Sequence, residues 1–108
     1  MSLEEKGFRR TLRIQGRNLV TVPDNGPGEA FRGTLNRIGA YAMTTSLSDD
    51  PRGKRFLEVH KDTTATLVRK TKIMDADSGE YFKITAVGLD CPEYARRYEA
   101  IQLTSKDA

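Results

Sequence analysis

The stretch Glu80–Val87, which reads EYFKITAV, has the clearest secondary-structure pattern in this chain. Apolar and polar side chains alternate along it with a period of two, which is the pattern of a β-strand that buries one face. We therefore expect a half-buried strand here and a β-rich fold around it. The expected inward side chains are Phe82, Ile84 and Ala86, and the expected outward ones are Tyr81, Lys83 and Thr85.

Further segments have the length and composition of strands. They are Arg10–Gln15, Asn18–Val22, Ala30–Thr45, Thr63–Lys70 and Tyr98–Thr104. Ala30–Thr45 is long enough for two strands or one bent strand, and its Gly33 and Gly39 predict bulges or close backbone approaches. The side chains expected to face the core from the shorter segments are Leu12, Ile14, Ala65, Leu67, Ile101 and Leu103.

Segments rich in Gly, Pro and Asp predict the turns between these strands. They are Pro23–Gly28, Ser48–Gly53, Asp75–Gly79 and Gly88–Pro92. Only two places invite a helix. Arg52–His60 fits one or two helical turns and a strand equally well, since Phe56 lies three and four residues before Val59 and His60. Pro92–Arg97 fits a short helix, because proline suits a first turn and basic residues suit a last turn.

Together these signals predict a mainly β fold, a small antiparallel β-barrel or sandwich of about six short strands with one or two short helical turns. A chain of 108 residues makes one domain, residues 1–108, with flexible ends at residues 1–8 and 105–108. Neither a membrane span nor secretion is expected, because no apolar run approaches about 18 residues and Met1–Arg10 lacks an apolar core.

No motif for catalysis, cofactor binding or metal binding is complete. The single Cys91 and the single His60 exclude an intramolecular disulfide and a four-ligand zinc cluster, and Cys91 lacks the flanking residues of a catalytic thiol. Asp75–Glu80 has Glu80 where a calcium loop needs glycine, so a hairpin turn explains it better. Gly26–Gly28 and Gly53–Arg55 fall short of the dinucleotide and phosphate-loop patterns. We expect no enzyme, no cofactor and no small-molecule substrate.

Charge is arranged in blocks that the formal net charge of +3 conceals. Pro51–Met74 sums to +5 and Asp75–Ala95 to −4. The two blocks either neutralise each other within one fold or form unlike faces suited to head-to-tail contact between copies. On the second interpretation, the residues expected at the subunit interface are Arg52, Lys54, Arg55, Lys70, Lys72, Asp75, Asp77, Glu80 and Glu93.

The basic block also permits a different partner. Small β-barrels bind single-stranded nucleic acid through aromatic platforms in a basic groove, and Phe56 lies within this block. Tyr81 and Tyr98, however, fall in or beside the acidic block, and no ribonucleoprotein-type aromatic motif is present. A small basic nucleic-acid-binding barrel is therefore the alternative function.

The order of elements resembles that of the small head–tail joining proteins of tailed phages. The resemblance starts with a basic N-terminal strand ending in Ile-Gln, continues through a turn, a long bent strand and a Ser/Gly/Arg-rich segment, and is best over Thr63–Thr104. The matching segments are Arg9–Gln15, Pro23–Gly28, Ala30–Thr45, Ser48–Phe56, Thr66–Lys70, Asp77–Ile84, Asp90–Arg97 and Glu99–Leu103.

This resemblance implies a structural protein of a phage or prophage. Such a subunit lies in a ring between portal and tail, so its partners are copies of itself and neighbouring portal and tail proteins. Its expected location is the virion, assembled in the cytoplasm of the bacterial host. A closed ring requires two unlike complementary faces on every subunit, and the charge blocks offer candidates for them.

Overall fold

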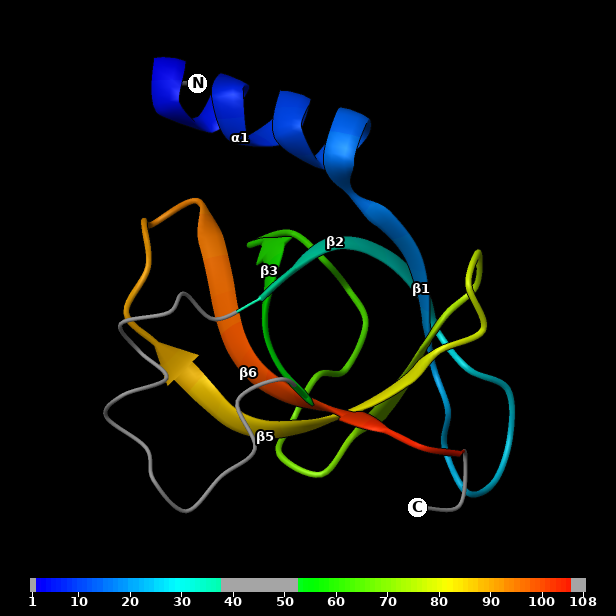
Figure 1. Ribbon diagram of the computed structural model, residues 1–108. Coiled ribbons are helices and arrows are strands. Elements are labelled where there is room, and N and C mark those ends of the chain that lie inside the picture. The colour runs from blue at the N-terminus through cyan, green and yellow to red at the C-terminus, as the bar shows by residue number, and fades with distance from the viewer. Residues whose placement is uncertain (1, 38–52, 106–108) are drawn as a thin grey trace.

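The structure is a computed structural model that describes residues 2–37 and 53–105, and it is mainly β. Six antiparallel strands close into one barrel in the order β1-β2-β3-β6-β5-β4, and a helix precedes them (Figure 1). The mainly β prediction is confirmed, and the closed sheet decides for a barrel over a sandwich. The elements are α1 (Leu3–Gln15), β1 (Arg17–Thr21), β2 (Ala30–Arg37), β3 (Lys54–His60), β4 (Lys72–Asp75), β5 (Tyr81–Leu89) and β6 (Ala95–Leu103).

The core fills the inside of the barrel, and β5 contributes two of its three predicted inward side chains to it. Phe82 and Ile84 are buried, and the apolar cluster around them contains Leu57 and Ile73, both fully buried. Ala86 is only half-buried, because the pairing of β5 with β6 shifts register between Ile84 and Ala86. Such a shift changes which face a side chain points to.

The strand predicted over Arg10–Gln15, with which the family resemblance begins, is wrong: these residues lie in α1. Ser2 caps this helix, since its side chain accepts a hydrogen bond from the Glu5 amide at 3.1 Å. Leu12 is buried while Ile14 is 66% exposed, as helical rather than strand geometry requires. The helix also takes up residues 3–8 of the expected flexible tail.

The structure also decides the two segments for which a helix was considered. Lys54–His60 is a strand, which resolves the open choice between helix and strand for that segment. Pro92–Arg97 is not a helix, because a turn closed by the Ala95 amide on the Pro92 carbonyl leads directly into β6. In β6 the buried residues include Tyr98 and Ala100, while the predicted inward residues Ile101 and Leu103 are half-buried.

The connection between β3 and β4 replaces the strand predicted over Thr63–Lys70. No strand lies between His60 and Lys72, yet Ala65 and Leu67 are buried in the core cluster as predicted. β3 and β4 run in opposite directions, and residues 61–71 connect the end of β3 to the start of β4 (Figure 1). The short strand β4 was not predicted from the sequence.

Gly33 confirms the predicted close backbone approach. A Cβ atom at this position would lie 2.9 Å from Val59 Cγ1 and 3.0 Å from the Glu58 carbonyl oxygen. Glycine therefore lets β2 and β3 pack at this distance. Gly39, the second half of the predicted Ala30–Thr45 strand, and the Ser48–Arg52 part of the second predicted turn lie outside the described residues, as does most of the predicted flexible end at 105–108.

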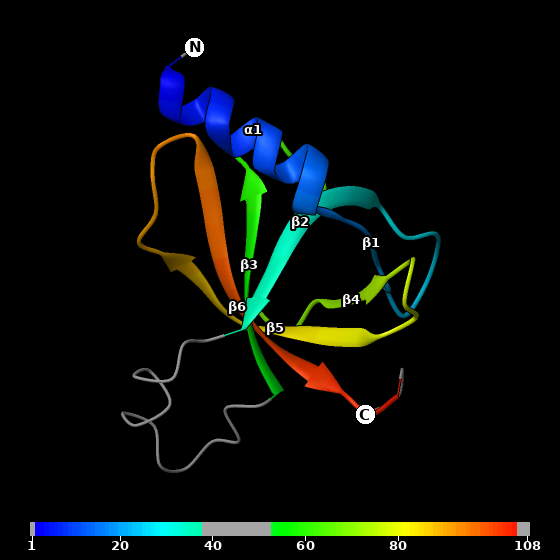
Figure 2. The same ribbon diagram turned by 45° about the horizontal axis from the view of Figure 1, so that its top comes forward.

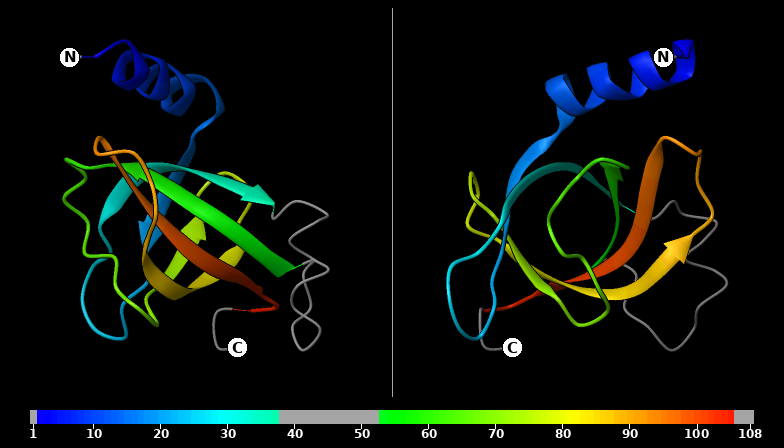
Figure 3. Two further views of the ribbon diagram at one scale, coloured as in Figure 1. Left: turned by 90° about the vertical axis from the view of Figure 1, so that its left-hand side faces the viewer. Right: turned by 180° about the vertical axis from the view of Figure 1, so that it is seen from behind.

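Helix α1 lies over β2 and β3 on one side of the barrel, as Figure 2 shows. The loop between β1 and β2, residues 22–29, lies away from the helix (Figure 3). Among the described residues, no helix has the length and apolar character needed to cross a bilayer.

Candidate functional site

Two of the predicted interface residues are buried inside this one subunit. Arg55 is 8% exposed, donates to the Lys54 carbonyl and to Gln102 Oε1, and holds its guanidinium 6.0 Å from the ring centroid of Phe82. Asp75 is 1% exposed. Neither side chain is accessible to a second subunit, so we remove both residues from the predicted interface. Arg52 lies outside the described residues.

Asp75 organises the hairpin between β4 and β5. Its Oδ2 lies 3.0 Å from Arg17 Nη1, and its Oδ1 accepts hydrogen bonds from the Asp77 and Ser78 amides. The Gly79 amide donates to the Asp75 carbonyl, and Gly79 has a φ of +78°. The hairpin turn predicted in place of a calcium loop is thus confirmed, and its buried aspartate has a structural role.

The remaining predicted residues lie at separate places on the surface. Lys70 and Lys72 lie at the start of β4, while Asp77 and Glu80 lie beyond its end. Lys54 begins β3, where its Nζ lies 3.9 Å from Glu99 Oε1. Glu93 is exposed in the connection between β5 and β6. The structure therefore brings the predicted residues together only around the β4–β5 hairpin.

A pocket of about 500 Å³ opens beside the start of β4, and we call it the basic pocket. Three lysines, Lys70, Lys72 and Lys83, contribute to its lining. Lys83 was missed from the sequence because it lies in the acidic block, and only the strand pairing brings it opposite Lys72. The other lining residues are Thr21, Val22, Pro23, Asp24, Asn25, Pro27, Glu29, Thr66 and Thr71.

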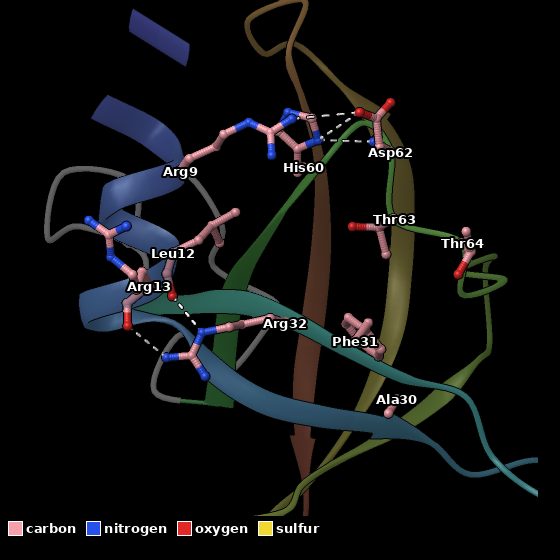
Figure 4. Close-up of a pocket in the computed structure, with 10 residues that line it drawn as sticks. All are labelled: Arg9, Leu12, Arg13, Ala30, Phe31, Arg32, His60, Asp62, Thr63 and Thr64. Carbon is pink, nitrogen blue, oxygen red and sulfur yellow. Dashed lines mark hydrogen bonds and ion pairs between the residues drawn. The ribbon is translucent and has the colours of Figure 1, made fainter. Parts of the chain in front are cut away.

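A second pocket, of about 460 Å³, is an open cleft between α1 and the barrel (Figure 4). We call it the helix cleft. Arg9, Leu12 and Arg13 line it from the helix, and Phe31, Arg32 and His60 line it from the barrel, with Ala30, Asp62, Thr63 and Thr64 completing it. Cys91 is not among these residues; its thiol donates to the Ala95 carbonyl at 3.2 Å.

His60 holds the helix to the barrel. Its Nε2 lies 2.9 Å from Glu5 Oε2, and its Nδ1 accepts a hydrogen bond from the Asp62 amide. Phe8 stacks on the His60 ring at 6.4 Å and contacts Tyr94 at 5.4 Å. The hydrogen bond from His60, followed in size by the opposing effect of burial, leaves the pKa of Glu5 below its ordinary value. His60 is thus a structural contact between α1 and the barrel.

Arg32 occupies the other end of the helix cleft, where α1 ends. Its Nε and Nη2 donate to the carbonyl oxygens of Leu12 and Arg13 at 2.7 and 3.0 Å (Figure 4), and its Nη1 donates to Asn18 Oδ1. A cation that satisfies the last carbonyls of a helix also opposes the negative end of its dipole. The cations of the helix cleft are therefore largely engaged with their own chain.

The candidate site is the basic pocket together with the hairpin turn, residues 76–80, which we call the acidic turn. Within residues 2–37 and 53–105 no group of three His, Cys, Asp or Glu side chains is placed to hold a metal ion. No family model matches this chain, and no curated protein sequence matches it either.

Proposed function

We propose that this chain is a non-enzymatic structural subunit of a phage or prophage virion, one that forms part of a ring joining portal and tail. The resemblance of its sequence segments to those of head–tail joining proteins supports the proposal from Asp77 onward, where the expected turn and strands are present. So does one feature of the fold: the β4–β5 hairpin carries basic side chains at one end and acidic ones at the other. That feature carries the proposal, because a ring needs two unlike faces.

The closed sheet restricts how copies join. A barrel in which every strand has two neighbours has no free edge to which another strand can be added. Contact between subunits then has to use side chains on the outer surface. Charged patches of opposite sign favour one head-to-tail orientation over all others. A subunit with these properties acts by contacting its neighbours in the assembled virion.

Self-association tests this function. We expect the chain to associate with itself, or to bind a portal ring, more strongly at about 50 mM than at about 500 mM salt, because salt screens surface charges. Lys70→Glu combined with Lys72→Glu should weaken that association while leaving the fold intact. Sedimentation velocity measures the association, and circular dichroism checks the fold.

The matched control reverses two exposed cations elsewhere. Lys6 and Arg10 lie exposed on α1, so Lys6→Glu with Arg10→Glu changes the net charge equally without touching the hairpin. Equal loss of association in both double variants would reject a specific face. Genes for portal, capsid and tail proteins beside this gene would support the proposal independently.

The basic pocket also favours a second function, binding of nucleic acid. Lysines contact phosphates without regard to sequence, and three of them line one pocket. Against this function, none of the described residues lining the pocket is aromatic, so no base-stacking platform is present there. Fluorescence anisotropy with a labelled oligonucleotide decides: if the lysine reversals affect only oligonucleotide binding, this second function replaces the first.

A further inference from the structure

We infer that the basic pocket is the receiving half of a subunit contact and that its ligand is the acidic turn of a second copy of this chain. The inference rests on the proposed function and names the partner and the residues that the ring would use. Three observations carry it: the backbone of Lys70, the pairing of Lys72 with Lys83, and the exposure of the acidic turn.

Lys70 adopts a backbone conformation that lysine rarely takes. Its φ is +77°, and it is the only residue other than glycine with positive φ in the described part of the chain. It is the third residue of a turn closed by the Thr71 amide on the Val68 carbonyl, a position that usually holds glycine or asparagine. A residue kept in a strained conformation points to a function for its side chain.

The second observation is a pair of like charges. Lys72 and Lys83 are directly opposite each other on β4 and β5, on the outer side of the barrel. Like charges at directly opposed positions destabilise an antiparallel pair. The strained Lys70 and this pair of like charges therefore lie in one pocket, and departures from local stability that coincide are typical of binding sites.

Several features favour carboxylates of a protein segment as the ligand of this pocket. The pocket lining holds threonine hydroxyls and lysines but, within the described chain, no aromatic ring on which a base would stack. Asp24 and Glu29 also line the pocket, and Glu29 Oε1 accepts a hydrogen bond from the Thr66 amide of the same chain. Asp24 and Glu29 would repel a continuous row of phosphates, whereas a short acidic turn needs to contact only the lysines.

The acidic turn is a suitable ligand on this chain. All of residues 76–80 are exposed, and Asp77 and Glu80 place two carboxylates within four residues. The turn lies at the far end of β4 from the pocket, and three residues of strand span about 10 Å. Because the hairpin itself holds these two sites apart, the turn meets the pocket of a neighbour rather than its own. Repeating that contact produces a head-to-tail assembly.

Complementary charge reversal tests the contact. One variant reverses the pocket, Lys70→Glu with Lys83→Glu; the other reverses the turn, Asp77→Lys with Glu80→Lys. Each alone should associate at least tenfold more weakly than the natural chain at low salt. An equimolar mixture should recover association, because each reversed pocket then meets a reversed turn. A chain with all four changes should also associate with itself.

The variant Lys70→Asn separates the contribution of the Lys70 side chain to self-association from the effect of this residue on stability. Asparagine tolerates positive φ, so this variant should melt at a higher temperature and yet associate more weakly. Unchanged association in this variant, or a mixture that associates no better than its two components, would overturn the inference.

The outcomes also separate the inference from the proposed function. If the natural chain associates or binds a portal ring but the mixture shows no recovery, the inference fails and the proposed function stands. If the natural chain does neither at low salt, both fail. If the pocket variant loses only binding to a labelled oligonucleotide, the pocket takes phosphates and the inference is wrong.

Discussion

Asp75 joins three parts of the chain through one buried carboxylate. Its Oδ2 accepts a hydrogen bond from Arg17 at the start of β1, and its Oδ1 accepts hydrogen bonds from two backbone amides of the acidic turn. The sequence marked Asp75 as a surface charge because aspartate in a turn is usually solvated. Its partner Arg17 lies 58 residues earlier, and nothing in local sequence pattern indicates so distant a pair.

Asp75→Asn should lower the free energy of unfolding by about 1–2 kcal/mol, because hydrogen bonds to a charged acceptor become hydrogen bonds to a neutral one. Asp77→Asn is the control, since Asp77 is exposed in the same turn. It should change stability by less than about 0.5 kcal/mol. Urea unfolding measures both, and equal effects would contradict the structural role of Asp75.

At the scale of elements, α1 shows how a short alternating pattern misleads. Leu12 and Ile14 alternate with polar residues as they would in a strand, but six residues cannot distinguish two periods well. The better signal lay upstream: Ser2 and Glu5 have the spacing of a capping box, and Phe8 and Leu12 are four residues apart, on one helical face. Strand β4 was missed for a similar reason, because four residues carry too little pattern.

Docking of α1 should depend on pH through Glu5. The docked helix favours its ionised form, because His60, Arg9 and Lys61 outweigh burial and hold its pKa below the ordinary 4.5. A lowered folded-state pKa gives stability that is complete above pH 4.5 and is lost as the pH falls through the lowered value. The ring contacts of Phe8 with His60 and Tyr94 should therefore weaken on acidification.

Nuclear magnetic resonance can follow these ring contacts from about pH 6 to about pH 3, the range in which a carboxylate titrates. Glu5→Gln removes the titrating group and should flatten the profile. Glu4→Gln is the matched control, because Glu4 is exposed in the same helical turn and has no contact to His60. A profile that Glu5→Gln leaves unchanged would assign the transition to another group.

For the whole molecule, the sequence was sufficient to predict the β architecture, but it was not sufficient to predict the order and pairing of the strands. Alternation in Glu80–Val87 and the turn-rich boundaries were sufficient for a small antiparallel barrel or sandwich, and the closed sheet then decided for the barrel. The count of six strands was right although Arg10–Gln15 and Thr63–Lys70 are not strands, because Lys54–His60 and Lys72–Asp75 take their places. Strand order depends on pairs such as Lys72 with Lys83 and Leu19 with Asp75, which only the closed sheet defines.

A closed barrel opens first where its pairing is shortest. β4 shares three paired positions with β1 and three with β5, whereas β3 and β6 share seven; of the two short junctions, only β4–β5 is also held by a hairpin turn. The amides of Val22 and Ala76, which donate to Lys72 and Asn18 across the β1–β4 junction, should exchange with solvent at least about tenfold faster than those of Leu57 and Val59. Because Arg17 and Asp75 bridge that same junction, Asp75→Asn should speed exchange there and leave β3 unchanged. A uniform increase over all six strands would mean instead that the barrel opens only as a whole.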